Sequence, residues 1–154
     1  MAKLFTFNRS VLLPQNCQQI YDLIDDVDSY KDFLPNCSDS GVFSRTLVEN
    51  KAEHVHGWLG LGIAGISQKF TTQNTHTPHS GIIMRLEDGP FETLAGQWTL
   101  KPLHAEDFSG CKATLDMQWA FNSTLLTMTI GAAFGKVAGQ LMDAFVAEAE
   151  RRYG

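Results

Sequence analysis

The chain has 154 residues, of which 44% are apolar and 19% charged, a composition typical of a globular protein and unlike that of a disordered one. This length predicts a single domain over residues 1–154. The net charge is −5, from 17 acidic and 12 basic side chains, which argues against binding that depends on neutralising many phosphates, so we expect no direct DNA binding.

The cysteines and the N-terminal segment indicate a reducing compartment. Cys17, Cys37 and Cys111 are odd in number and widely spaced, and no pair has the CxxC spacing of a zinc or redox site. The first residues alternate in polarity and include Lys3 and Arg9, unlike a signal peptide. No apolar stretch is expected to approach the roughly 20 residues that span a bilayer. We therefore expect a cytoplasmic protein.

Apolar and polar residues alternate over residues 5–13, which predicts a half-buried strand. Pro14 ends this strand, and Asn16 is a candidate N-cap for a short helix. Asp28 can cap a second short helical turn, which Pro35 stops. The first helix places four apolar side chains on one face: Ile20, Leu23, Ile24 and Val27. Two short helices are therefore expected after the first strand.

Residues 41–121 read as one strand after another. The clearest strand is 112–121, which places five apolar side chains on one face: Ala113, Leu115, Met117, Trp119 and Phe121. Residues 81–88 and 92–103 also alternate, and we expect Pro102 to close the second of these strands. With the N-terminal strand, the sequence predicts a sheet of six or seven strands. The connections are short, so the sheet should be mostly antiparallel.

The chain ends in a helical period. After a cap at Asn122 or Ser123, apolar residues recur at spacings of three and four over residues 123–152. These apolar residues are Leu126, Ile130, Phe134, Val137, Leu141 and Phe145. The opposite, polar face is predicted to contain Lys136, Gln140, Asp143, Glu148 and Arg151. The order of elements predicts an α+β fold, in which a curved antiparallel sheet around one long helix often leaves a cavity.

We predict no catalytic residue and no metal site. His54 and His56 share a strand face and could hold a metal ion as a pair, but no third ligand lies nearby in sequence, so solvent-facing histidines are the favoured interpretation. Cys37 has no neighbouring base and is expected to be a buried small hydrophobe. The glycines from Gly57 to Gly65 lack the following helix N-terminus of a dinucleotide-binding motif.

Two glycine-rich segments have two interpretations each. The apolar run 58–66 lies where a hairpin should turn. It is either a hairpin whose side chains enter the core and whose glycines permit a bulge, or a flexible tip that gates a cavity or touches a membrane. Gly131, Gly135 and Gly139 lie four residues apart on the last helix, where each costs about 1 kcal/mol relative to alanine. They allow either close packing of helix on sheet or room for a ligand beside the helix.

Five segments in the same order resemble the coenzyme Q-binding, START-like family. Residues 26–37 are similar to the family block DV-x-x-Y-x-x-FLP-x-C. Further blocks match at residues 65–72, 88–91, 96–103 and 134–137. The resemblance covers nearly the whole chain, and the family includes bacterial ribosome-association toxins.

The resemblance implies a helix-grip fold with a hydrophobic ligand cavity and no catalytic machinery. The favoured function is non-enzymatic binding of ubiquinone or a related polyprenyl lipid, in support of quinone biosynthesis or respiratory electron transfer. The alternative is docking on the large ribosomal subunit, which would block subunit association and inhibit translation. No cofactor is expected apart from ubiquinone as a bound ligand, and peripheral contact with the inner membrane stays open.

Inward-facing positions predict the lining of the cavity. Large side chains of the sheet would form its wall, while Gly96, Gly131 and Gly135 would keep its floor low enough for a chain-like ligand. A solid core made of the same residues is the alternative. The predicted lining consists of Phe33, Leu34, Phe70, Phe91, Leu94, Trp98, Met117, Trp119, Phe134, Gly135, Leu141 and Met142.

Overall fold

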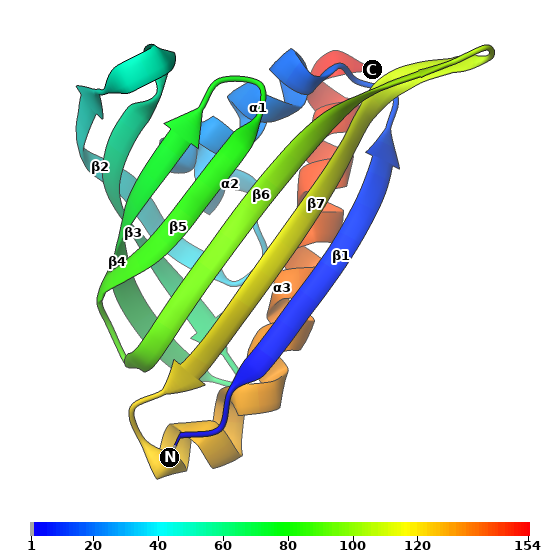
Figure 1. Cartoon of the computed structure of the whole chain (residues 1–154). Helices are drawn as coiled ribbons and strands as arrows, with labels where there is room; N and C mark the ends of the chain where they lie inside the picture. Colours follow the sequence, from blue (N-terminus) through cyan, green and yellow to red (C-terminus); the bar gives the residue numbers. More distant parts are fainter. Residues whose placement is uncertain (1) are drawn as a thin grey trace.

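Seven antiparallel strands form one sheet in the order β1-β7-β6-β5-β4-β3-β2 in the computed structural model, which describes residues 2–154 (Figure 1). The strand count agrees with the prediction. Each strand from β2 to β7 pairs with its neighbour in sequence, and β1 closes the order against β7. The strands are β1 (Phe5–Leu13), β2 (Cys37–Leu47), β3 (Glu53–Ile63), β4 (Ile66–Thr77), β5 (Gly81–Asp88), β6 (Phe91–Ala105) and β7 (Phe108–Phe121).

Two short helices follow β1, as predicted. They are α1 (Cys17–Asp25) and α2 (Tyr30–Phe33), with the 3-10 turn η1 (Val27–Ser29) between them and a second turn, η2 (Glu49–Lys51), after β2. Asn16 caps α1, because its side chain accepts a hydrogen bond from the Gln19 amide. The prediction that Asp28 caps α2 is wrong. The Asp28 carboxylate instead accepts a hydrogen bond from the Val42 amide at 3.2 Å, which ties this turn to β2.

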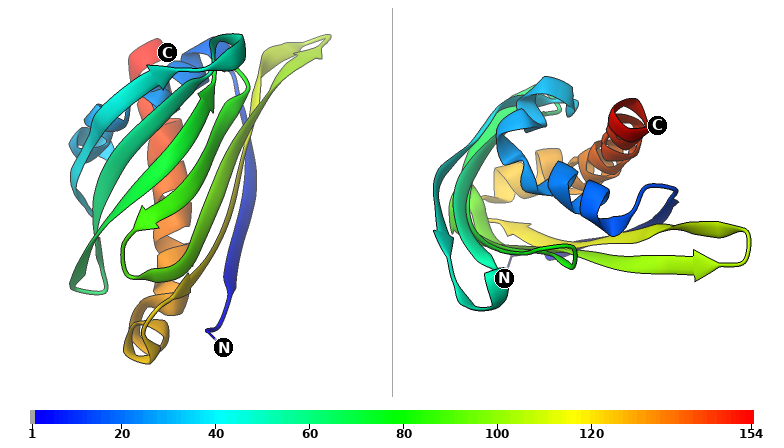
Figure 2. Two further views of the ribbon diagram at one scale, coloured as in Figure 1. Left: turned by 60° about the vertical axis from the view of Figure 1, so that its left-hand side comes forward. Right: turned by 90° about the horizontal axis from the view of Figure 1, so that it is seen from above.

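The last helix, α3 (Thr124–Tyr153), is unbroken and lies along the concave side of the curved sheet (Figure 2). The predicted helix over residues 123–152 is confirmed, and Ser123 is its cap, since its hydroxyl accepts a hydrogen bond from the Leu126 amide. Glu148 was placed on the polar face, but it is only 7% exposed, because Arg151 and Arg152 fold over its carboxylate.

Helix α3 also corrects the expectation that no segment is apolar enough to span a bilayer. It has 30 residues and contains an 18-residue window of mean hydropathy 1.2. Its many alanine and glycine residues keep that window almost free of charge. The core helix of a soluble protein has the same character, and here α3 packs across the sheet.

The glycines of α3 allow close packing against β1 and β7. A Cβ atom at Gly131 would lie 2.4 Å from the Phe5 ring, and one at Gly135 would lie 3.4 Å from the Trp119 ring. The Gly139 carbonyl accepts a hydrogen bond from Arg9 at 3.3 Å. These glycines therefore serve close packing of the helix on the sheet and do not leave room for a ligand, because aromatic rings of the sheet occupy the space beside them.

The run 58–66 forms an ordinary hairpin rather than a free tip. Ala64 and Gly65 make its two-residue turn with φ of 50° and 80°. Leu61 and Ile63 are each 1% exposed and enter the core. The register between β3 and β4 is unbroken, so the expected bulge is absent from this pair. Register shifts lie instead in the pairings of β2 with β3, β4 with β5 and β6 with β7.

Strand β6 continues past Pro102, which was expected to close it. Pro102 pairs with Cys111, and the β6–β7 hairpin projects beyond the rest of the sheet (Figure 1). The pairing with β5 ends at Thr99, and the Leu100 amide still donates to the Ser80 carbonyl at 2.8 Å. A proline is tolerated there because an edge strand leaves the amides of one side unpaired.

Candidate ligand-binding cavity

An apolar space of about 100 Å³ lies between the sheet and α3. Inward-facing side chains of β3 to β7 form one wall, and α2 and α3 form the other. Its aromatic and aliphatic lining makes this space dry and suited to an apolar group. The lining consists of Tyr30, Leu34, Leu59, Leu61, Phe70, Thr72, Met84, Leu94, Gly96, Trp98, Leu115, Met117, Phe134, Val137, Ala138, Leu141 and Phe145. We call this space the apolar lobe.

A second space of about 70 Å³ adjoins the apolar lobe and is more polar. The two spaces share six lining residues: Tyr30, Leu59, Phe70, Thr72, Met84 and Trp98. Asn74 and His76 line the second space but not the first. Both are buried, at 6% and 0% exposure. We call this space the polar lobe, and together the two lobes form a cavity with an apolar end and a polar end.

Seven of the twelve residues predicted to line a cavity do line the apolar lobe: Leu34, Phe70, Leu94, Trp98, Met117, Phe134 and Leu141. Gly96, predicted to keep the floor low, lines it as well. That these residues contact a ligand stays a prediction.

The other five predicted residues pack elsewhere. Phe91 stacks on Phe121 with ring centroids 4.9 Å apart, and Trp119 packs against the helix at Gly135. Met142 is fully buried in the core, and Phe33 lies edge-on to Phe145. Aromatic rings therefore fill the region between the sheet and the start of α3, and the cavity lies farther along the helix.

The size of the cavity limits what it holds in this conformation. The lobes measure about 100 and 70 Å³, whereas pockets for drug-sized ligands span roughly 300–1,000 Å³. A ring with a short tail is therefore the largest group that suits the closed form. A long polyprenyl chain requires the side chains of α3 or the sheet to move apart.

Charged residues that are distant in sequence orient the buried His76. Asp25 at the end of α1 lies 2.6 Å from Nδ1 of His76. Arg45 of β2 donates to the same carboxylate at 3.0 Å and to the Asp25 carbonyl at 2.7 Å. Partial burial alone would raise the pKa of Asp25, but the hydrogen bonds from His76 and Arg45 outweigh it and lower that pKa.

One signal in the sequence could have located His76. Phe70 was assigned to the inside of the sheet, and alternation along β4 then places Thr72, Asn74 and His76 on the same face. Its partner Asp25 could not be found in this way, because 51 residues separate the two and only the docking of α1 brings them together.

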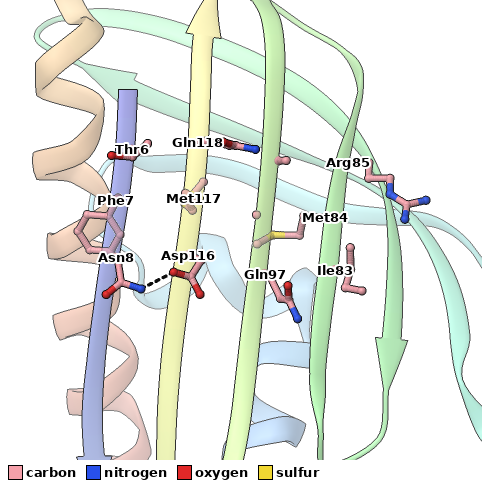
Figure 3. A pocket seen from close by; sticks show the side chains of 12 residues that line it. Thr6, Phe7, Asn8, Ile83, Met84, Arg85, Gln97, Asp116, Met117 and Gln118 are labelled. Atoms are coloured by element: carbon pink, nitrogen blue, oxygen red, sulfur yellow. Dashed lines mark hydrogen bonds between the residues drawn. The ribbon is translucent and has the colours of Figure 1, made fainter. Parts of the chain in front are cut away.

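A hollow on the outer face of the sheet is a different feature (Figure 3). It measures about 380 Å³ and crosses β1, β7, β6 and β5. Exposed side chains such as Arg85, Gln97 and Asp116 surround it, and the Asn8 amide donates to Asp116. This hollow is shallow and open to solvent, unlike the enclosed pockets that hold apolar ligands.

The histidines and cysteines singled out in the sequence take up separate positions. His54 is exposed, whereas His56 is half-buried and bonded to Glu87. Within residues 2–154 no three histidine, cysteine or acidic side chains gather closely enough to hold a metal ion. Cys37 is half-buried rather than buried, because it lies at the start of β2. The thiols of Cys17 and Cys111, 94 residues apart in sequence, lie 2.9 Å from each other.

Residues 13–146 match the family described as polyketide cyclase/dehydrase and lipid transport. The chain belongs to this family. The match covers the whole cavity, from α1 to most of α3. It agrees with the START-like resemblance drawn from the five sequence blocks.

Relatives that are similar in sequence include both ribosome association toxins and a coenzyme Q-binding protein. The ribosome association toxin RatA of Pseudomonas aeruginosa is 38% identical over 146 residues, which cover 95% of this chain and 96% of that protein. The mitochondrial coenzyme Q-binding protein COQ10 of Drosophila melanogaster is 27% identical over 149 residues, 96% of this chain and 60% of that protein. Neither relative is named as an enzyme.

A solved structure supports the fold. The aromatase/cyclase ZhuI from a Streptomyces species superimposes with a TM-score of 0.78, covering 99% of this chain and 97% of that one, at 17% identity. At this identity the likeness shows the START-like helix-grip fold alone. The predicted fold class is therefore confirmed.

Proposed function

We propose that this protein binds a hydrophobic ligand of the polyprenyl quinone class between the sheet and α3, without catalysing a reaction on it. The observation that carries the proposal is the apolar lobe of about 100 Å³ that remains inside an otherwise close-packed fold. The name of the COQ10 relative supports a quinone as the ligand.

Burial of an isoprenoid tail supplies the binding free energy. Each CH₂ group moved out of water contributes about 0.8 kcal/mol, so one isoprene unit of five carbons can contribute about 4 kcal/mol. The apolar lobe offers no charged group that would oppose this transfer. Longer tails gain more but must first separate the walls, so affinity should rise with tail length less steeply than this value implies.

Titration with a short-tailed ubiquinone tests the proposal. Trp98 lines both lobes, so a bound quinone should quench its fluorescence. We expect saturable quenching that is strongly reduced in Trp98→Phe. Absence of saturation with ubiquinones of one to three isoprene units would contradict the proposal.

A second candidate function is docking on the large ribosomal subunit, with inhibition of subunit association. The specific observation in its favour is the RatA relative at 38% identity over nearly its full length. This role would place the protein in the cytoplasm. The net charge of −5 means that any contact with ribosomal RNA must come from a local group of basic residues.

Sedimentation separates the two candidates. If the second holds, the protein added to dissociated ribosomal subunits should move with the large subunit and reduce the amount of joined ribosomes. Recovery of the protein only at the top of the gradient, at low salt, would exclude ribosome docking and leave ligand binding as the proposed function.

A further inference from the structure

The polar lobe contains two buried acceptor positions that the fold leaves without a partner. Within residues 2–154, neither Oδ1 of Asn74 nor Nε2 of His76 has a hydrogen-bond partner. Both residues line the lobe. A buried polar atom left unpaired costs about 1–3 kcal/mol, so a group that satisfies these atoms would bind favourably.

The charged network fixes which nitrogen of His76 carries the proton. A carboxylate only accepts hydrogen bonds, so the Nδ1 atom that lies 2.6 Å from Asp25 must carry the hydrogen. In a ring with one proton, Nε2 is then bare and acts as an acceptor. Arg45 holds the carboxylate from its other side, which keeps the imidazole in this orientation.

The neighbouring polar groups do not change this pattern. The Tyr30 hydroxyl already donates to the Ile24 carbonyl. Trp58 also lines the lobe, and its indole nitrogen lacks a partner, but its ring packs against Phe43 with centroids 4.5 Å apart, on the face of β3 opposite to Leu59. The unpaired acceptors at the lobe are therefore Oδ1 of Asn74 and Nε2 of His76, which lie two residues apart on β4.

We infer that the polar lobe recognises the hydroxyl group of an aromatic head group, that of a phenol or a hydroquinone. The hydroxyl donates to Nε2 of His76 or to Oδ1 of Asn74, the ring lies between Tyr30 and Trp98, and the tail extends into the apolar lobe. An oxidised quinone carries acceptors only and leaves both protein atoms unpaired. The inference rests on the proposed ligand-binding function and specifies the redox form that the site prefers.

Three forms of one ligand test this inference on the unaltered chain. The probes are a benzoquinone with one isoprenyl group, its hydroquinone, and the dimethyl ether of that hydroquinone, titrated anaerobically by calorimetry. The hydroquinone should bind about tenfold more tightly than the other two, since each neutral hydrogen bond contributes roughly a factor of 3 to 10. The ether has nearly the same ring and tail but no donor.

A pair of variants assigns the effect to the polar lobe. Asn74→Leu removes the acceptor at nearly constant volume, and it should weaken hydroquinone binding about three- to tenfold without changing quinone binding. Thr75→Val is the matched control on the same strand, because its side chain alternates to the outer face. It should change neither affinity.

Each outcome has a distinct meaning. Equal affinity for the three probes would overturn the inference and leave the cavity function intact, with Asn74 and His76 then satisfied by water. Failure of all three probes to bind would overturn the proposed function together with the inference. If Asn74→Leu does not fold, the comparison of hydroquinone and ether on the unaltered chain still shows whether the site prefers a hydroxyl donor.

Discussion

Filling the apolar lobe from α3 should stabilise the protein and at the same time abolish ligand binding. Ala138 lines the lobe and is 2% exposed, so Ala138→Leu adds three carbons to the cavity. A void of about 100 Å³ corresponds to about 2.4 kcal/mol at about 24 cal/mol per Å³. One leucine fills only part of it, so we expect the free energy of unfolding to rise by about 1–2 kcal/mol.

Two matched substitutions on the same helix bracket this effect. Ala147→Leu adds the same atoms on the exposed face and should change stability by less than about 0.5 kcal/mol. Ala149→Leu adds them where the core is already full, at 0% exposure, and should cost about 1–3 kcal/mol. Urea denaturation followed by tryptophan fluorescence measures all three. For a chain of this size, 1 kcal/mol moves the melting temperature by about 2–4 °C.

Ligand titration completes the test of the lobe. Ala138→Leu should weaken binding of a short-tailed ubiquinone at least tenfold, whereas Ala147→Leu should leave it unchanged. If Ala138→Leu is instead as destabilising as Ala149→Leu, the space between sheet and helix is already filled, and the reasoning from cavity volume is refuted.

Two further predictions concern α3 itself. The ion pairs of Glu148 with Arg151 and Arg152 lower the pKa of Glu148 from about 4.5 to about 2. The stability that this carboxylate contributes is therefore complete above pH 4.5 and is lost as the pH falls towards 2. Glu148→Gln should flatten the dependence of stability on pH in that window, and an unchanged dependence would contradict the pairing. Gly135→Ala should be neutral or stabilise the protein by up to about 1 kcal/mol. Gly131→Ala should destabilise it, because the new Cβ would lie 2.4 Å from the Phe5 ring. Equal melting temperatures for the two variants would refute the assigned packing.

The sequence predicts most of this fold because its periodicities are strong. Alternation in residues 112–121 and the change to a helical period near Asn122 both survive in the structure, since the sheet has one wet face and α3 has one buried side. The predictions that failed concern contacts that periodicity does not describe, whether with another strand or between side chains of one helix. Pro102 was expected to end a strand that in fact continues, paired with β7 on one side only. Glu148 was expected to face solvent, but Arg151 and Arg152 cover its carboxylate.

The candidate site follows the same division. Alternation alone placed Phe70 and Trp98 on the inner face, and both line the cavity. It could not show that Trp119 fills the end of the space beside Gly135, because that contact depends on how α3 crosses β7. Nor could it pair His76 with Asp25, which only the docking of α1 on the sheet brings together.

Native mass spectrometry of the protein purified from its own host tests the central claim most directly. We expect a population that carries one bound molecule, with the mass of a prenylated aromatic compound, and we expect its loss in Ala138→Leu but not in Ala147→Leu. Detection of the bare chain alone, under conditions in which an added short-tailed ubiquinone also fails to bind, would contradict it.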